Sequence, residues 1–168
     1  MGGFVGIAFD WSTGSILRCR TSGNFSYGIS GYGSGTDVLV EDCTATNSPE
    51  PLRVESLVAS FRGNRCTFSG GSSATASFSQ SNVTLRDCHI LNGGGRSVRL
   101  DDDIRYSPGT YDLTGNWWGT TDSDQIAAWI YDAVDKPSIG AVVQYEPFLL
   151  KPVPTERKSL GGIKGLFR

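Results

Sequence analysis

A short residue pattern recurs along most of this chain with a period of about 23 residues. Each copy reads apolar, polar, apolar, two polar residues, and then Asn or Cys. The closing residues lie 21 to 28 positions apart, at Cys19, Cys43, Asn64, Cys88 and Asn116. A repeat of this length is typical of a solenoid, because one unit cannot bury its apolar face without stacking on the next unit.

A second series of residues keeps the same period. A short segment with alternating apolar residues precedes each copy of the repeat, and alternation of period two indicates a strand. The expected strands are Ile7–Phe9, Tyr27–Ile29, Leu52–Val54, Ala76–Phe78 and Val98–Leu100. We therefore predict an all-β fold, a right-handed parallel β-helix of about five coils over residues 4–120, because parallel crossovers are almost always right-handed.

The Asn and Cys positions are expected to form a ladder inside this β-helix. Stacked amides can bond from coil to coil, and a thiol is a small, weakly polar replacement at the same corner. An antiparallel sandwich also contains many short strands, but it would not predict matched corners. Side chains stacked in this way point in the same direction, so free buried thiols are favoured over disulfides.

The residues after the repeat predict a cap over 121–150. Asp122 and Gln125 fit a capping box, and apolar residues at helical spacing follow them, so a helix is expected over 122–134 with a closing strand after it. No similar cap precedes the first coil. We expect that end to continue into upstream coils of a larger protein or to contact another chain.

Charge separates the body of the chain from its end. Residues 1–150 contain 10 basic and 16 acidic side chains, whereas residues 151–168 contain five basic ones against Glu156 and are expected to form a basic linker or tail. The net charge of -2 argues against a nucleic-acid partner, which would be held through phosphate contacts. No apolar run approaches the roughly 18 residues of a membrane span.

Two copies of the repeat, Val83-Thr-Leu-Arg-Asp-Cys-His-Ile90 and Phe61-Arg-Gly-Asn-Arg-Cys66, resemble the right-handed parallel β-helix repeats of the pectate-lyase-like superfamily. The segment Gly115-Asn-Trp-Trp-Gly-Thr120, with Gln144-Tyr-Glu-Pro-Phe148 after it, resembles the closing part of bacterial secreted β-helix proteins. The resemblance covers residues 5–150. It implies a bacterial, extracellular parent protein and a polysaccharide partner.

In this superfamily, functional sites usually lie on the outward face of the strand that precedes the variable loops. That face and the two long loops that leave it, Ser30–Asp37 and Asp101–Thr110, give carbohydrate-binding candidates. They are Arg53 and Glu55 on the face, and Tyr32 and Tyr106 in the loops. The most charged segment gives catalytic candidates, which are Asp101, Asp102, Asp103, Arg99 and Arg105. The three aspartates could hold Ca²⁺ through their oxygens, or act as general acid and base on a glycosidic bond.

The catalytic pattern of the family is incomplete in this chain. The family's hydrolases combine aspartates with His, Arg and Lys, but the single histidine, His89, follows the Cys88 corner, and no Arg-x-Lys follows the aspartates. The predicted function is therefore a non-catalytic structural or carbohydrate-binding module without a cofactor other than Ca²⁺. Two alternatives stay open: a lyase or glycoside hydrolase remnant that uses Asp101–Asp103, and a unit that self-assembles end to end.

Overall fold

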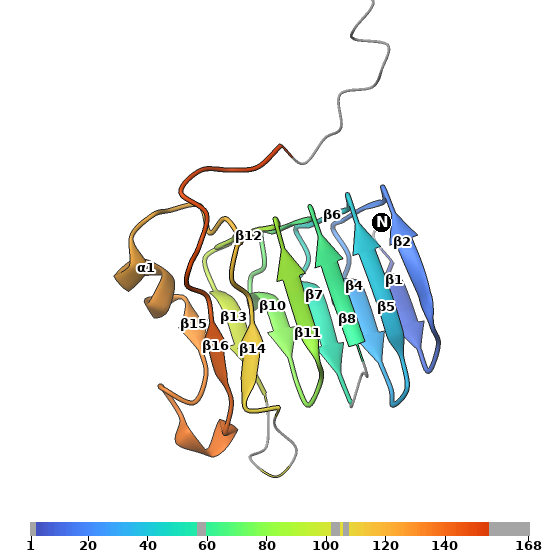
Figure 1. Ribbon diagram of the computed structural model, residues 1–168. Coiled ribbons are helices and arrows are strands. Elements are labelled where there is room, and N and C mark those ends of the chain that lie inside the picture. Colours follow the sequence, from blue (N-terminus) through green and yellow to red (C-terminus); the bar gives the residue numbers. More distant parts are fainter. Residues whose placement is uncertain (1–2, 57–59, 102–104, 106–107, 155–168) are drawn as a thin grey trace, which may run out of the picture.

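The computed structural model describes residues 3–56, 60–101, 105 and 108–154, and over this range the chain winds into a right-handed solenoid (Figure 1). Each turn contributes one strand to each of up to three sheets, and every strand pairs in parallel with its equivalent in the next turn. Stacking of this kind is how short strands, none longer than six residues here, bury a common apolar face.

The three sheets have the following strands in spatial order. The first sheet contains β1 (Val5–Asp10), β4 (Tyr27–Tyr32), β7 (Glu50–Glu55), β10 (Ala74–Phe78), β13 (Arg96–Leu100) and β15 (Ile130–Tyr131). The second contains β2 (Gly14–Leu17), β5 (Asp37–Glu41), β8 (Ser60–Asn64), β11 (Val83–Arg86), β14 (Thr110–Asp112) and β16 (Val142–Gln144). The third contains β3 (Arg20–Ser22), β6 (Thr44–Thr46), β9 (Thr67–Ser69) and β12 (His89–Leu91).

These strands make four complete turns rather than the predicted five. The fifth turn has β13 and β14, but it extends the third sheet only by a single bridge between His89 and Trp117. The third sheet was not predicted as separate strands, since three residues are too few to show a period. The parallel β-helix itself is confirmed, and its buried apolar residues form one continuous core.

The inward ladder differs from the prediction at one position. The strand register places Thr44 opposite Thr67 and Thr67 opposite His89, so the residues that precede them, Cys43, Cys66 and Cys88, share one corner. Asn64 instead pairs with Glu41 and Arg86 at the end of the second sheet. The prediction that Asn64 belongs to the ladder was wrong. The sequence pattern fits Asn64 and Cys66 equally well, and only the pairing of the third-sheet strands shows that Cys66 is at the corner.

The corrected corner column consists of Cys19, Cys43, Cys66, Cys88 and Asn116. The Cys19 N–H donates to Cys43 Sγ at 3.3 Å, the Cys66 N–H to Cys88 Sγ at 3.4 Å, and the Cys88 N–H to Asn116 Oδ1 at 2.9 Å. All four thiols are free, as predicted. The residue before each column member has a positive φ, between 52° and 69°, which turns the chain into the next sheet.

The cap helix is shorter than predicted. It spans α1 (Ser123–Ala128), and Asp122 Oδ1 accepts the Gln125 N–H at 3.1 Å. The expected continuation to residue 134 is wrong because Ile130 and Tyr131 leave the helix and pair with β13 as β15. A 3-10 helix (Pro137–Ile139) and β16 complete the closure. Buried Asp132 holds it together, accepting the Val134 and Val143 N–H groups at 2.8 Å each.

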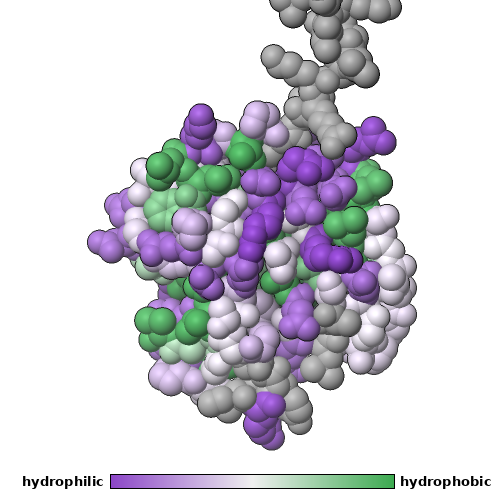
Figure 2. Space-filling model, in the orientation of Figure 1, coloured by the Kyte–Doolittle hydropathy of each residue, from purple (hydrophilic) through white to green (hydrophobic). Residues whose placement is uncertain are grey.

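The surface differs between the middle and the two ends of the solenoid. Figure 2 shows mostly hydrophilic side chains over the face formed by the second sheet, with hydrophobic ones gathered near the cap and near the first strands. Ion pairs such as Arg62 with Asp37, at 3.1 Å, lie on this face. In the described part of the chain, no helix has the length and apolar character needed to cross a bilayer. The expected basic tail lies outside the described residues from 155 onward.

Candidate functional site

The outer face of the first sheet carries side chains that stack in columns from turn to turn. One column contains Ser30, Arg53, Ser77 and Arg99, and the next contains Asp10, Tyr32 and Glu55. This register follows from period-two alternation, which puts every second residue of a strand on the same face. The predicted outward positions of Arg53, Glu55 and Arg99 agree with it.

An arginine–carboxylate network, made of Arg53, Arg99, Glu50, Glu55 and Asp101, crosses three turns of this face. Arg53 bonds Glu55 through Nη2 at 2.5 Å, and Asp101 and Glu50 through Nη1 at 2.9 and 3.3 Å. Arg99 Nη2 bonds Glu50 Oε1 at 2.8 Å and Asp101 Oδ2 at 3.1 Å. Each arginine therefore shares the same two carboxylates, Glu50 and Asp101.

The network covers a serine whose hydroxyl makes no hydrogen bond to the described residues. Ser77 lies between Arg53 and Arg99 in the register and is fully buried. Within the described part of the chain, its Oγ has no hydrogen-bond partner. The arginine side chains thus pass over β10 and exclude water from the sheet beneath them.

The carboxylates keep both arginines charged. Burial alone would lower the pKa of Arg53, but Glu55, Glu50 and Asp101 outweigh it and raise that pKa above its ordinary value. Burial acts on Arg99 in the same direction, and Asp101 and Glu50 again raise its pKa. Neither guanidinium can act as a base, and the network as a whole carries three negative charges against two positive ones.

A groove of about 400 Å³ lies beside the network, over the first three turns. The residues that line it include Asp10, Trp11, Tyr27, Tyr32, Arg53 and Glu55. The rings of Trp11 and Tyr32 meet edge to face, with centroids 5.9 Å apart, and Trp11 remains 67% exposed. Gly33 makes room for the indole, since a Cβ there would lie only 2.7 Å from Trp11 Cδ2.

The groove and the network bring together several residues singled out from the sequence. Tyr32, Arg53 and Glu55 line the groove, while Asp101 and Arg99 belong to the adjoining network. Arg105 is exposed. Asp102, Asp103 and Tyr106 lie outside the described residues. His89 lies on β12 of the third sheet, away from this face, and burial lowers the pKa of its imidazole.

Three important residues of this face were missed from the sequence. Asp10 could have been found, because it occupies the same alternating position as Tyr32 and Glu55 in neighbouring turns. Trp11 follows it directly in the sequence. Glu50 had no such signal. It begins a run of three buried residues, Glu50, Pro51 and Leu52, which hides the alternation at the start of β7.

The prediction of calcium at Asp101–Asp103 stays a prediction. Among the described residues, no three His, Cys, Asp or Glu side chains are grouped so that they could hold a metal ion. The carboxylate of Asp101 is bonded to both arginines of the network. Two of the three proposed ligands lie outside the described range.

Comparison with known proteins identifies the fold but no individual relative. The family model of the right-handed β-helix region matches residues 5–115, about two thirds of the chain. None of the curated proteins or solved structures compared with the chain matches it. The matched range includes the four complete turns, the groove and the whole arginine–carboxylate network.

Proposed function

The chain belongs to the right-handed β-helix family, and from this premise we propose that it is a non-catalytic module that binds extended polysaccharide on the outer face of its first sheet. The observation that carries the proposal is the groove in which Trp11 and Tyr32 stand beside acidic and hydroxyl groups. Polysaccharides of this kind occur outside cells, so we also propose an extracellular location.

The aromatic pair supplies the apolar surface that a sugar ring needs. A pyranose presents C–H groups on its faces and hydroxyls around its edge, and an indole packs against such a face at low entropic cost. Trp11 is held in place by Gly33 on one side and Tyr32 on the other, so its ring is preorganised. An exposed aromatic pair that is fixed in this way is suited to a ligand rather than to the core.

The polar residues of the groove suit the hydroxyl edge of the same ring. Carboxylates of Asp10 and Glu55 can accept hydrogen bonds from sugar hydroxyls, and the Tyr27 hydroxyl can donate or accept. Equivalent positions recur about every 4.8 Å along the solenoid axis. This spacing presents a regular row of polar groups to an extended polymer.

Charge selects among polysaccharides. The network has one excess negative charge, and Asp10 adds another, so the face is acidic although it contains two arginines. An acidic polymer such as polygalacturonate would be repelled, whereas an uncharged or amino-sugar polymer would not. We therefore propose neutral or amino-sugar polysaccharides as the ligand class.

The ion pairs of Arg53 and Arg99 with the network carboxylates support a binding role over lyase chemistry. A lyase needs a basic group that removes a proton from the sugar, and the raised pKa values of Arg53 and Arg99 keep both groups protonated. The hydrolase alternative was expected to use Asp101–Asp103, of which only Asp101 lies among the described residues. At the groove a hydrolase would need a pair of carboxylates such as Asp10 and Glu55, and this is tested below as an outcome.

Affinity electrophoresis and calorimetry on xylohexaose, chitosan hexamer and polygalacturonate test the proposal. We expect binding of the first two, with about tenfold weaker affinity for Trp11→Ala and for Tyr32→Ala. Phe25→Ala is the matched control, because Phe25 is a similarly exposed aromatic, at 64%, that does not line the groove.

Three results would count against parts of the proposal. Absence of binding to all three polymers, or an equal loss in Phe25→Ala, would remove the groove as a carbohydrate site. Preference for polygalacturonate would contradict the assigned ligand class. New reducing ends that disappear in Glu55→Gln or Asp10→Asn would show a hydrolase instead of a binding module.

A further inference from the structure

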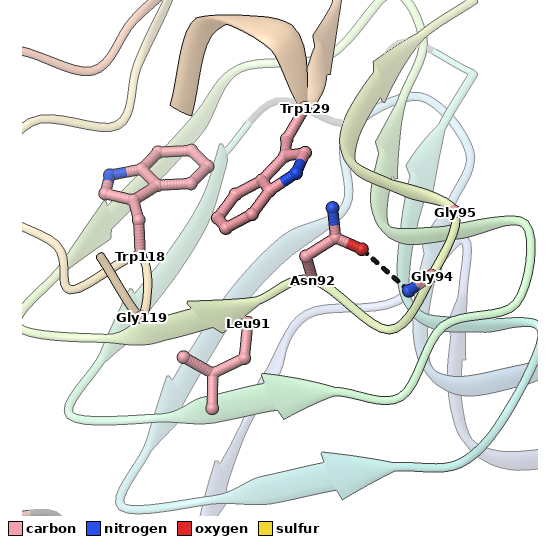
Figure 3. Close-up of a pocket in the computed structure, with 7 residues that line it drawn as sticks. All are labelled: Leu91, Asn92, Gly94, Gly95, Trp118, Gly119 and Trp129. Atoms are coloured by element: carbon pink, nitrogen blue, oxygen red, sulfur yellow. Dashed lines mark hydrogen bonds between the residues drawn. The ribbon is translucent and has the colours of Figure 1, made fainter. Parts of the chain in front are cut away.

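A second hollow, of about 610 Å³, lies at the opposite end of the solenoid from the groove, where the third sheet meets the cap (Figure 3). Two tryptophans, Trp118 and Trp129, stand on one side of it, and Leu91 and Asn92 at the end of β12 lie on the other. Gly94 and Gly119 also line it and leave the space open.

The walls of this hollow are fixed by backbone contacts. The carbonyl of Trp129 accepts the Ser97 N–H at 2.8 Å, so β13 holds the position from which the indole projects. Asn92 Oδ1 accepts the Gly94 N–H at 2.7 Å, which fixes the amide in the turn (Figure 3). The hollow is therefore formed before any ligand arrives, which lowers the entropic cost of binding.

Two side-chain donors at the hollow make no hydrogen bond to the part of the chain that the structure describes. Asn92 uses its Oδ1 for the Gly94 N–H, and both hydrogens of its Nδ2 are left for a ligand or water. The same is true of Trp129 Nε1, whose side chain is half-buried. Both residues line the hollow, and none of the residues that line it carries a charge.

We propose that this hollow binds one ring of a neutral sugar, as a site separate from the groove on the first sheet. The indole of Trp129 offers an apolar face for the ring, and the Asn92 and Trp129 N–H groups offer donors to ring and hydroxyl oxygens. An apolar peptide side chain fits less well, because it would cover both donors without accepting from them. An anionic ligand would find no cation among these walls.

Calorimetry and ligand-observed NMR with cellotetraose and xylotetraose test this site. The experiment uses the full chain carrying Trp11→Ala and Tyr32→Ala, so that binding at the groove is removed. We expect residual binding of one tetraose per chain. Trp129→Ala in this background should weaken that binding at least tenfold.

Two conservative variants examine the donors without removing the walls. Trp129→Phe retains an aromatic face but lacks Nε1–H, and we expect about fivefold weaker binding. Asn92→Asp keeps an acceptor for the Gly94 N–H but replaces the amide donor, and we expect about tenfold weaker binding. Trp117→Phe is the matched control, since Trp117 is the neighbour of Trp118 but does not line the hollow.

The proposal is overturned if the groove-deficient chain binds neither tetraose, or if Trp129→Ala leaves the residual affinity unchanged. Binding of N-acetyltryptophanamide in place of the sugars would also overturn it and would indicate a peptide partner. If Trp129→Ala does not fold, as judged by circular dichroism, Trp129→Phe and Asn92→Asp decide the result. A failure of the groove proposal is recognised separately. In that case the single substitution Trp11→Ala, in an otherwise unchanged chain, would not weaken polysaccharide binding.

Discussion

The corner column and the arginine–carboxylate network both join one turn of the solenoid to the next, but with opposite chemistry. The column is neutral, mostly buried, and uses nearly the same side chain in every turn, from Cys19 to Asn116. The network is charged and partly exposed, and its central column reads Ser, Arg, Ser, Arg. Repetition therefore accompanies the fold, and departure from repetition accompanies the candidate site.

The difference has a physical origin. A corner position inside the coil has the same volume and the same backbone groups to pair in each turn, so a similar side chain fits there in every turn. On the outer face, a side chain is limited only by its neighbours and by water. Long side chains such as Arg53 and Arg99 can reach across an intervening turn there, passing over Ser77.

The largest expected effect lies at the buried end of the column. Asn116 Nδ2 donates to the carbonyls of Leu85 and Leu113 at 2.9 and 2.8 Å, and its Oδ1 accepts the Cys88 N–H. Asn116→Ala would leave these groups buried without partners, and we expect a loss of about 4 kcal/mol in the free energy of unfolding, measured with urea.

Asn64→Ala is the control for this substitution. Asn64 has the same side chain but lies outside the column, half-buried, with its Nδ2 donating to Glu41 Oε1 at 3.3 Å. We expect a loss below about 1 kcal/mol there. Equal losses in the two variants would show that the column has no special role. Asn116→Cys should recover part of the stability, since thiols fill this position in the preceding turns.

A smaller loss is expected in the network. Arg53→Ala would leave Glu50, which is only 7% exposed, with Arg99 as its single cation, and we expect about 2 kcal/mol of destabilisation. Arg62→Ala removes an exposed ion pair with Asp37 on the second sheet and should cost less than about 0.5 kcal/mol. If Arg53→Ala and Arg62→Ala lower the free energy of unfolding in urea by the same amount, the network adds no more stability than an exposed ion pair.

The last expected effect is a pH dependence of the column, which appears only above pH 9. Burial raises the pKa of the Cys43 thiol from 9.0 to about 11, and a hydrogen bond with Cys88 together with burial also raises that of Cys66. The folded state then holds protons that the unfolded state loses, so stability is complete below pH 9. It should fall by about 2 kcal/mol from Cys43 alone as the pH rises from 9 to 11.

Unfolding measured between pH 8 and pH 11 tests this expectation. Cys43→Ala should flatten the dependence, although Cys66 leaves part of it in place. A stability that rises over this range would contradict the assignment of buried, protonated thiols.

The sequence was sufficient for the architecture because the architecture is repetitive. The apolar residues of the first sheet and the Asn and Cys corners each kept the period, so the parallel β-helix followed from spacing alone. Details that depend on register were less secure. The expected strands Ile7–Phe9 and Tyr27–Ile29 would end side by side, but β4 runs on to Tyr32, so that Gly31 and not Ile29 lies beside Phe9. The Asn64 error has the same cause.

The candidate site could be predicted only in part, because a site is where the repeat is broken. Arg53 and Glu55 were accessible through alternation, which gives the direction of a side chain, whereas Tyr32 was expected in a loop and lies at the end of β4. That Arg53 meets Asp101, 48 residues later in the chain, depends on how far two side chains reach across a turn. The hollow beside Trp129 could not be predicted because its position depends on where α1 ends. The apolar residues keep helical spacing beyond Ala128, so the sequence predicted a longer helix.

The free thiols of the corner column also have a consequence for how the chain is made. Cys43, Cys66 and Cys88 are inaccessible once the turns have stacked, yet nothing shields them in the unfolded chain. A thiol that is buried and protonated does not exchange, whereas an exposed one reacts with any oxidant present. In an oxidising compartment, ordering of the corners therefore competes with disulfide formation, and stacking the turns first is what keeps the sulfur atoms reduced.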